Sequence, residues 1–368
     1  MFKKTQSYLG VDIGKTSVKI VELRQVKGKS TLINYGYSEE SRDFSNEELQ
    51  LDIDKSAKII KRICDKSDIN NINCIAAMPS FSVFSSVLNL SHANKKDIDN
   101  AVMLEAKKVV PLDLDEMILD WKIIEESSLA IPQKVSEADE EDGEGSVKNG
   151  QEKNKEDLKV LLTGAPKSLV KKYISIFKEA KMNLISLETE MFSLVRSLVG
   201  NDPSIIAIVD LGAVNTDIAI IENGLPMFSR SLDSGGIMMT KAISDSLKVD
   251  FKRAEQFKID LSSSGRQENS GSFPKVIEET ITPIVNEIKY SLNLFQQENS
   301  KKIEKLIVSG GGANLPSIAE YLSNILNIKV IVGDPWSRIS YPLDLKPALD
   351  ELGPQMAIAV GLAMRETL

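Results

Sequence analysis

The stretch that decides the fold runs Leu9-Gly10-Val11-Asp12-Ile13-Gly14-Lys15-Thr16-Ser17-Val18-Lys19-Ile20, and its pattern returns as Ala207-Ile208-Val209-Asp210-Leu211-Gly212-Ala213-Val214-Asn215-Thr216-Asp217-Ile218. Each copy is an apolar run, an aspartate, an apolar residue, a glycine, a short polar turn and a second apolar run. The pattern predicts a β-hairpin, because its tight turn needs the glycine and exposes backbone N–H groups. One such hairpin is weak evidence, but a repeat in the same register indicates a duplicated structure.

Two such turns facing each other would bind a polyphosphate, since backbone N–H groups and small hydroxyl groups bind phosphate oxygens. Asp12 and Asp210 would lie at strand ends, where they suit a hydrated Mg²⁺ held through its waters. A third turn, residues 310–313, follows an apolar strand at 305–309 and precedes a helix that we expect Asn314 to cap. Its glycines would let a flat ring or a ribose lie against bare backbone. This order of hairpin, hairpin and strand–glycines–helix is typical of the nucleotide site of the actin-like fold.

The composition narrows the class of protein. A chain of 368 residues that is 42% hydrophobic suggests two domains or one large bilobed domain. Its net charge of −8, with no basic stripe evident, argues against nucleic acid as a partner. Two cysteines and one histidine lack the spacing of a metal site, so neither zinc nor Ser-His chemistry is expected. Neither a secretory signal nor an apolar stretch long enough to span a bilayer is evident, so we expect a cytoplasmic protein.

The remaining elements also repeat in order. Apolar segments rich in β-branched residues predict a meander, a helix and a returning strand in the first half, over residues 8–12, 18–25, 31–37, 54–64 and 72–78. The second half should contain another meander and two helices, over residues 205–211, 217–222, 226–231, 237–247 and 274–297. The expected fold class is therefore α/β, an actin-like ATPase fold with two duplicated lobes around a nucleotide cleft and a small inserted α/β subdomain.

The chain should divide accordingly. We expect a lobe I core at 1–80 with the C-terminal helix 353–368, an inserted subdomain at 81–166, and connecting helices at 167–200. Lobe II would have its core at 201–234 and 303–352, and a small subdomain at 235–302. Within the insert, residues 133–157 are strongly acidic and contain no aromatic residue, so burial cannot offset the entropy of ordering them. We expect a disordered loop there, with an acidic docking segment as the alternative.

Further motifs lie along nearly the whole chain: Ala76-Ala77-Met78-Pro79, Glu105-Ala106, Val110-Pro111-Leu112, Phe228-Ser229-Arg230, Gly235-Gly236 and Ser309-Gly310-Gly311-Gly312-Ala313-Asn314-Leu315-Pro316. With the two hairpins, they make the chain resemble the PilM family of type IV pilus assembly proteins, relatives of the division protein FtsA among the actin-like ATPases. The resemblance implies a site for ATP and Mg²⁺ and a cytoplasmic scaffold at the inner face of the cytoplasmic membrane, without direct membrane insertion. It also implies that the N-terminal tail of a PilN-like inner-membrane protein docks on the insert.

The resemblance assigns the phosphate loops. The first loop would comprise Asp12, Gly14, Thr16, Ser17 and Lys19. Lys19 would then lie opposite the terminal phosphates, although a plain exposed strand residue is the alternative. The second loop would comprise Asp210, Gly212, Asn215 and Thr216. Asp12 and Asp210 would hold Mg²⁺ through water.

The resemblance also assigns the nucleoside and hydrolysis residues. Gly311, Gly312 and Ala313 would face the adenosine. Glu255 and Lys258 lie one helical turn apart, so they could both reach the ribose and base, or instead form a surface ion pair. Glu190 occupies the place where filament-forming relatives hold a water-orienting glutamate, and a cap on a solvent-exposed helix is its alternative role.

We therefore expect an ATP-binding scaffold of a pilus or related competence platform that is at most a slow ATPase. A sugar or acetate kinase of the same superfamily is one alternative, but no positioned general base for a substrate hydroxyl is evident. An FtsA-like division protein is another, but no basic amphipathic helix follows Arg365. The partner peptide would occupy a groove in the insert, whose candidate wall residues are Val87, Leu88, Leu90, Val102 and Leu104.

Overall fold

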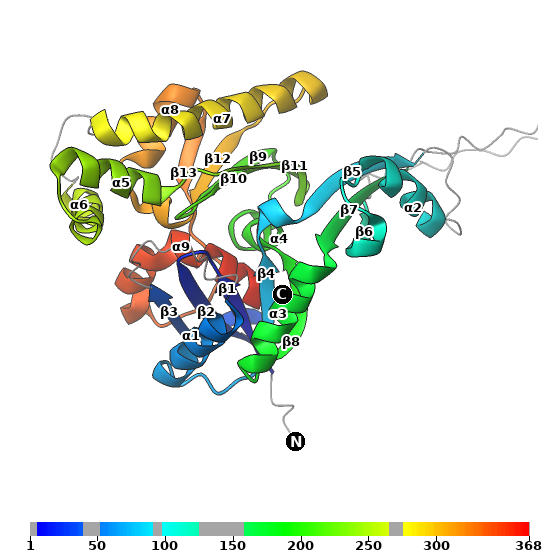
Figure 1. Ribbon diagram of the computed structural model, residues 1–368, viewed down its shortest axis with the longest axis horizontal. Helices are drawn as coiled ribbons and strands as arrows, with labels where there is room; N and C mark the ends of the chain where they lie inside the picture. The colour runs from blue at the N-terminus through cyan, green and yellow to red at the C-terminus, as the bar shows by residue number, and fades with distance from the viewer. Residues whose placement is uncertain (1–5, 40–51, 91–97, 125–157, 265–274, 368) are drawn as a thin grey trace, which may run out of the picture. The chain divides into compact units, whose positions relative to one another are not determined.

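The structure, a computed structural model, describes residues 6–39, 52–90, 98–124, 158–264 and 275–367 (Figure 1). The chain forms two compact units. Unit 1 comprises Met1–Val83 with Ala165–Leu368, and unit 2 comprises Phe84–Gly164. Within the described residues, unit 1 holds two five-stranded sheets and unit 2 holds one three-stranded sheet.

The first sheet of unit 1 is a meander extended by two parallel strands. Its strands are β1 (Ser7–Ile13), β2 (Ser17–Val26), β3 (Lys29–Glu39), β4 (Asn73–Met78) and β8 (Asn183–Thr189). Their order is β3-β2-β1-β4-β8, in which β1, β2 and β3 are antiparallel neighbours and β4 runs parallel to both β1 and β8. The helices α1 (Ile53–Lys66) and α3 (Lys167–Glu179) pack on one face of this sheet, over side chains such as Leu9 and Ile20.

The second sheet of unit 1 repeats this plan. Its strands are β9 (Ile206–Leu211), β10 (Thr216–Glu222), β11 (Leu225–Leu232), β12 (Lys305–Ser309) and β13 (Lys329–Val332). The order β11-β10-β9-β12-β13 again places a three-stranded meander beside two parallel strands. Its outer face packs against α5 (Gly236–Leu247), α7 (Lys275–Asn299) and α8 (Ile318–Leu326), while α6 (Phe251–Ser264) packs on α5. The predicted duplication of the two hairpins thus extends to both sheets.

One helix is shared by the two sheets. The helix α9 (Lys346–Met364) buries Met356, Ala359 and Val360 against β2 of the first sheet. It also contributes Ile358 to a core that lines the second sheet together with α4 (Glu190–Leu194) and the π-helical turn Val195–Val199. The close contact between α9 and β1 requires a glycine on the strand. A Cβ at Gly10 of β1 would collide with the backbone of α9.

Unit 2 is a small α/β unit with its own core. Its sheet has the order β5-β7-β6, formed by β5 (Phe84–Leu90), β7 (Leu158–Pro166) and β6 (Met117–Ile123), with β5 antiparallel to β7. The helix α2 (Ile98–Val109) packs on this sheet through Val102 and Ala106. As described, β5 and β6 are the two edge strands of the sheet.

Two helix starts differ from the predictions. Asn314 does not cap α8, because residues 311–314 form a 3₁₀ turn and the helix begins only at Ile318. The last helix begins at Lys346 rather than at residue 353, since it accommodates Pro354 in its interior.

The predicted domain division stays a prediction. The stretch 167–200, expected to connect through helices, also contributes the edge strand β8. The acidic segment 133–157 lies outside the described residues, as does the start of the helix expected from residue 95.

Candidate functional site

The first hairpin turn places a lysine against a buried aspartate. The N–H of Gly14 donates to the carbonyl of Ser17 at 2.9 Å and closes the turn between β1 and β2. Lys19 lies directly opposite Asp12 across the two strands, and its Nζ donates to Asp12 Oδ2 at 3.0 Å. Burial alone would lower the pKa of Lys19, but the charge and hydrogen bond of Asp12, together with the charges of Asp210 and Glu190, outweigh it and the pKa is raised. Lys19 is therefore a buried cation in the wall of the pocket, not an exposed strand residue.

The second hairpin has the same turn and the opposite charge pattern. The N–H of Gly212 donates to the carbonyl of Asn215 at 3.0 Å, as Gly14 does in the first hairpin. Asp217 lies directly opposite Asp210 in the register of β9 and β10. Burial, followed by repulsion from Asp217 and then Asp12, raises the pKa of Asp210 to about 7. This end of the pocket thus holds an excess of buried negative charge that favours binding of a cation.

The third turn follows β12 and stays close to the second hairpin. Gly310 has a φ of +80°, and a Cβ there would lie 2.8 Å from Asp210 Oδ1, so both conformation and space require glycine. Its N–H and the hydroxyl of Ser309 both donate to the carbonyl of Pro354 at 3.0 Å, which ties the turn to α9. A Cβ at Gly311 would meet nothing within 4 Å. Gly311 therefore presents bare backbone to the pocket.

The pair predicted for the nucleoside end forms a local network. Lys258 Nζ donates to Glu255 Oε2 and to Thr240 Oγ1, each at 2.8 Å, and to the carbonyl of Gly236 at 3.2 Å. The hydroxyl of Thr240 also donates to Glu255. The ion pair thus joins α6 to α5, and both of its members line the pocket. The sequence left two alternatives for Glu255 and Lys258, an ion pair or residues that line the site. In the structure the same two side chains form the ion pair and line the pocket.

Glu190 reaches across to another element. It is the first residue of α4, and its Oε2 accepts the N–H of Ser80 at 3.0 Å. Burial, then repulsion from Asp217 and Asp12, raises its pKa well above the ordinary value, although the Ser80 N–H opposes the shift. Glu190 therefore caps the turn at Ser80–Ser82 rather than its own helix, and its surroundings favour the protonated form.

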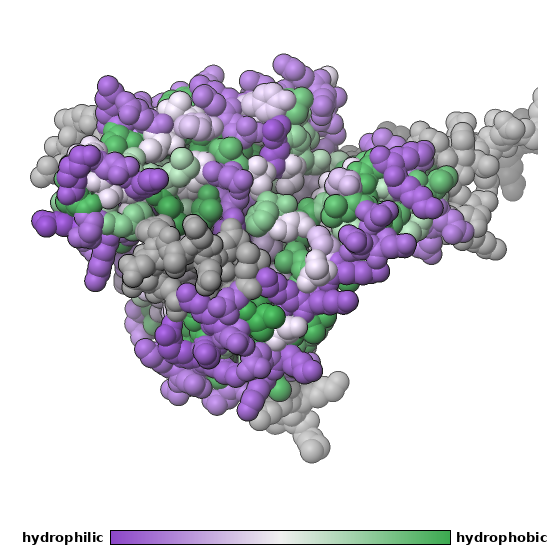
Figure 2. Space-filling view, viewed as in Figure 1, coloured by the Kyte–Doolittle hydropathy of each residue, from purple (hydrophilic) through white to green (hydrophobic). Residues whose placement is uncertain are grey.

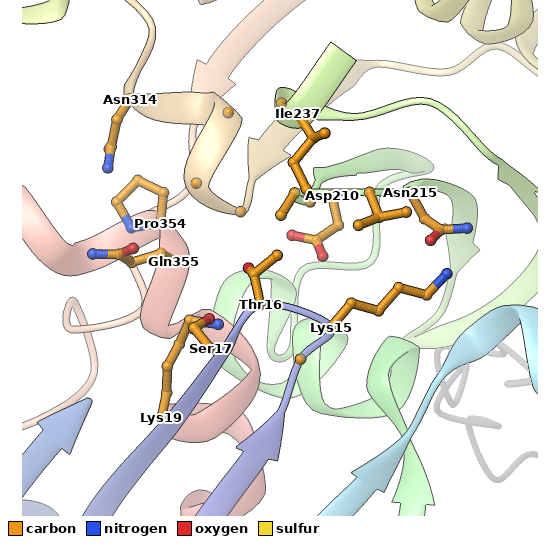
Figure 3. Close-up of a pocket in the computed structure, with 18 of the residues that line it drawn as sticks. Lys15, Thr16, Ser17, Lys19, Asp210, Asn215, Ile237, Asn314, Pro354 and Gln355 are labelled. Atoms are coloured by element: carbon orange, nitrogen blue, oxygen red, sulfur yellow. The ribbon is translucent and has the colours of Figure 1, made fainter. Parts of the chain in front are cut away.

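These three turns and two helices line one pocket of about 950 Å³ in unit 1 (Figure 3). The sequence-predicted residues that line it are Asp12, Gly14, Thr16, Ser17, Lys19, Glu190, Asp210, Gly212, Asn215, Glu255, Lys258, Gly311 and Gly312. Thr216 and Ala313 do not line the pocket. The hydroxyl of Thr216 is buried and donates to the carbonyl of Ser234 at 2.7 Å, while Ala313 packs into the core of the second sheet.

The charged residues of the pocket that were not predicted from the sequence are Lys252, Glu351 and, on the two hairpins, Lys15 and Asp217. Lys15 lies 4.6 Å from the centroid of the Phe81 ring, and Figure 3 shows its side chain extending toward Asn215 of the second hairpin. Asp217 faces Asp210 as described above. The two hairpin residues could have been found by aligning the two repeats, because Lys15 follows the turn glycine and Asp217 occupies the place of Lys19.

The residues of the second hairpin suit a hydrated divalent cation. Asn215 is buried, its Nδ2 donates to Asp233 Oδ1 at 2.7 Å, and its Oδ1 has no hydrogen-bond partner among the described residues. A metal-bound water could donate to this oxygen, and Asp210 beside it offers a carboxylate acceptor. The residues present therefore fit a Mg²⁺ held through water at Asp210, as predicted, with Asn215 as the second acceptor, whereas the other predicted residue, Asp12, pairs with Lys19.

The comparisons with known proteins agree with this geometry. A family model described as type IV pilus assembly protein PilM matches residues 10–137 and 146–367. The chain belongs to the PilM family. It is also 22% identical over 359 residues to the cell division protein FtsA of Enterococcus faecalis, covering 89% of this chain and 79% of that protein.

Two solved structures show the fold that the PilM family shares with its relatives. A structure described as a PilM-PilN type IV pilus biogenesis complex matches with a TM-score of 0.78 at 20% identity, over 98% of each chain. MreB5 of Spiroplasma citri bound to AMPPNP matches with a TM-score of 0.53 at 14% identity, over 99% of this chain and 97% of that one. The predicted family and the predicted actin-like ATPase fold are confirmed. Among the described helices, none combines the length and the apolar character that a membrane span requires.

Proposed function

We propose that this PilM-family protein binds MgATP in the pocket of unit 1 and acts as a scaffold of the pilus assembly platform. The observation that carries the proposal is the pair of identical hairpin turns lining one pocket, with lysines on the first and carboxylates on the second. MreB5, which shares the fold, was solved with the ATP analogue AMPPNP.

The first hairpin would bind the phosphates. Lys19 is held at the pocket wall by Asp12, so its ammonium group is already positioned and its remaining hydrogens can donate to a terminal phosphate. Thr16 and Ser17 add hydroxyl groups from the same turn, and Lys15 adds a second cation. Charge-assisted hydrogen bonds of this kind are about twice as strong as neutral ones.

The second hairpin would hold the metal. Asp210 and Asp217 would accept hydrogen bonds from the waters of Mg²⁺, with Asn215 Oδ1 as a further acceptor. Bound Mg²⁺ would supply the positive charge that two opposed carboxylates lack, and it would neutralise part of the phosphate charge. The buried carboxylates would then regain their ionised form, because the cation lowers their pKa.

The remaining walls would bind the nucleoside. Glu255 and Lys258 lie on α6 at one side of the pocket and can offer an acceptor and a donor to ribose hydroxyl groups. The bare backbone at Gly311 and Gly312 would accept the flat face of the base. Thr216 and Ala313 would support these loops from behind.

Hydrolysis should be slow. Orienting or activating a water needs a carboxylate that accepts its proton, and Glu190 has its pKa raised well above the ordinary value while one oxygen already accepts the Ser80 N–H. We therefore propose that nucleotide binding, rather than rapid turnover, is the working property of this site.

Gly311 offers a direct test of the site. A leucine at this position would find open space, so the variant Gly311→Leu should fold normally while its side chain fills the base end of the pocket. Isothermal calorimetry should show at least a roughly hundredfold weaker MgATP affinity for Gly311→Leu, since each tenfold corresponds to about 1.4 kcal/mol. The matched control Gly311→Ala adds one methyl group and should bind within about threefold of the wild type. Unchanged affinity in the leucine variant would place the nucleotide elsewhere.

We propose that the partner surface lies on unit 2. The PilM-PilN complex, whose PilM-like chain matches this one along its length, supports a PilN-like partner here. Leu88, Leu90 and Val102 are buried in the core of unit 2, so they cannot form the wall of a groove as the sequence had suggested. Leu104 is instead 60% exposed. Among the described residues of unit 2, the other exposed large apolar side chains are Met103, Val109, Leu112 and Ile118.

We propose that the N-terminal tail of the PilN-like protein docks on these exposed side chains or adds to the edge strand β5 or β6. Such a partner would hold the scaffold at the inner face of the membrane. A pull-down with the synthetic N-terminal peptide should succeed with the wild type and fail with Leu104→Glu. Leu343→Glu is the matched control, because Leu343 is 83% exposed in unit 1 and its replacement should leave peptide binding intact. Equal loss in both variants would contradict the assignment.

A further inference from the structure

The helix layer α1–α3 of unit 1 is strongly basic in an acidic chain. Residues 53–66 and 167–181 together contain ten lysines and arginines and three acidic residues, a net +7, whereas the whole chain carries −8. The rest of the protein is therefore far more acidic than the total suggests. The sequence analysis saw no basic stripe because the two segments lie about a hundred residues apart and meet only in the fold.

The two helices form one continuous surface. In Figure 1 they lie side by side on the same face of the first sheet, and Lys61 of α1 forms an ion pair with Glu179 of α3 at 3.7 Å. Their inner sides are fully buried: Ile60 on α1 and Ile176 on α3 belong to the same core. Figure 2 shows hydrophilic residues over most of this lower part of the molecule, with isolated hydrophobic residues among them.

The exposed side of α3 carries lysines and one apolar side chain. Lys171, Ile174 and Lys178 are exposed at spacings of three and four residues, which places them on one side of the helix, and exposed Lys181 follows at its end. Ile174 is 51% exposed between the lysines. On α1, Lys58 and Lys66 are exposed as well. The apolar face of α3 packs in the protein core, so its exposed lysines can attract an anionic surface while Ile174 offers one apolar contact.

We propose that the basic face of α1 and α3 adsorbs directly to an anionic phospholipid bilayer. The lysines would contact the lipid headgroups, and Ile174 would reach between them. The strongly negative remainder of the chain would be repelled by the same bilayer, so the protein would bind in one orientation. This contact does not depend on the nucleotide pocket, and it would act together with a partner tethered to the membrane, because stable anchoring usually takes two signals.

The chemistry of the face favours lipid over other anionic partners. Its exposed cations are lysines except for Arg62 on α1, and lysines act as point charges that do not make the forked hydrogen bonds that arginine makes to phosphates. The aromatic residues of α3, Tyr173 and Phe177, are buried, so none of them can stack on nucleic acid bases. A protein interface would usually place aromatic residues or arginine at its centre, and here the centre is the single aliphatic Ile174.

The test is vesicle co-sedimentation with the full chain at low and high salt. Vesicles of phosphatidylcholine mixed with phosphatidylglycerol should bind the protein, and vesicles of phosphatidylcholine alone should not. The triple variant K171E/K178E/K181E should lose at least about a hundredfold in affinity, because each lysine near an anionic surface contributes separately. The matched control K289E/K302E/K329E changes the net charge equally at exposed positions of the second lobe, and it should lose less than about threefold.

The outcomes separate the proposal from its competitors. Ile174→Asp should weaken vesicle binding by about tenfold and Ile174→Ala by less, since only the first places a charge at the headgroups. Unchanged melting temperatures would show that all variants fold. The proposal is wrong if the wild type ignores anionic vesicles or if both triple variants lose binding equally. It is also wrong if the basic face retains duplex DNA rather than vesicles in a parallel binding assay.

Discussion

The two hairpins at the pocket share one backbone and carry opposite charges. In each, the turn glycine donates its N–H to the residue three positions on, and an aspartate ends the first strand. The residue opposite that aspartate is Lys19 in the first hairpin and Asp217 in the second. The first pair is an ion pair, while the second is a repulsive pair of carboxylates. In the proposed site, a single cross-strand position would therefore distinguish the hairpin that binds phosphate from the one that binds the metal.

This difference shows how a duplicated structure can divide the work of binding a charged ligand. MgATP combines a strong anion with a cation, so its site needs donors on one side and acceptors on the other. Both hairpins close with the same turn, and in the proposed site the charge of one strand residue would decide which half of the ligand each hairpin binds. The predictions below test this division.

The largest effect is expected from removing the cation of the first hairpin. Lys19→Ala should weaken MgATP affinity by a factor of about a hundred or more, because it removes a charge-assisted hydrogen bond and leaves Asp12 buried beside the phosphates. Isothermal calorimetry measures the change. Lys305→Ala, which removes a lysine paired with Asp202 and absent from the pocket wall, is the control and should bind normally. Comparable losses in both variants would rule out the assigned role.

The second effect concerns the metal. Asp210→Asn should weaken MgATP binding by about tenfold, because metal-bound waters lose a charged acceptor. Affinity for ATP in the presence of EDTA should stay equal or improve, because a negative charge near the phosphates is gone. The ratio of the affinities with and without Mg²⁺ is therefore the quantity to measure, and an unchanged ratio would assign the metal to other residues.

The third prediction compares how one substitution in each hairpin changes the free energy of unfolding of the protein without nucleotide. Asp217→Asn should raise the free energy of unfolding by about 1 kcal/mol, because it relieves like charges that face each other across the strands. Asp12→Asn should lower it by about 2 to 3 kcal/mol, because it removes the partner of the buried Lys19. Urea denaturation measures both. The signs must be opposite, and equal signs would contradict the comparison.

The smallest effect is a pH dependence. The pKa of Asp210 is raised from 3.8 to about 7, so between these values the folded state binds a proton that the unfolded state has lost. The raised pKa of Asp210 therefore increases the free energy of unfolding at low pH, and this stabilisation is lost as the pH rises toward 7. The melting temperature of Asp210→Asn relative to the wild type should be nearly equal near pH 4, and its advantage should grow until the pH passes 7. A constant difference across this range would show that Asp210 is ionised throughout.

Much of this site was predictable from the repeat, and the rest was not. The apolar runs predicted the strands β1 and β9, so the positions of Asp12 and Asp210 near the ends of these strands followed from the pattern alone. Thr216 was placed in the pocket because it ends the second turn, but its hydroxyl turns inward to the Ser234 carbonyl. A local sequence pattern shows which residues share a turn. It does not show which side chain donates a hydrogen bond to a backbone carbonyl elsewhere in the chain.

The longer-range features needed the fold itself. The start of α9 at Lys346 was missed because proline usually ends a helix, and here Pro354 lies within one while its carbonyl accepts two hydrogen bonds from the third turn. The basic face of α1 and α3 was missed because net charge averages over the chain. Both features depend on contacts between segments that the sequence places far apart.

The shared helix α9 has a consequence for synthesis. The strand residues Val21, Leu23 and Leu32 form one core with Met356 and Val360 of α9. A ribosome makes the strands β1, β2 and β3 of the first sheet early, but it makes the helix that covers this face more than three hundred residues later. Until then the apolar face of the first sheet has no cover from its own chain. The first lobe therefore cannot mature until α9 has been made, and the order of domain-by-domain folding from the N-terminus does not apply to it.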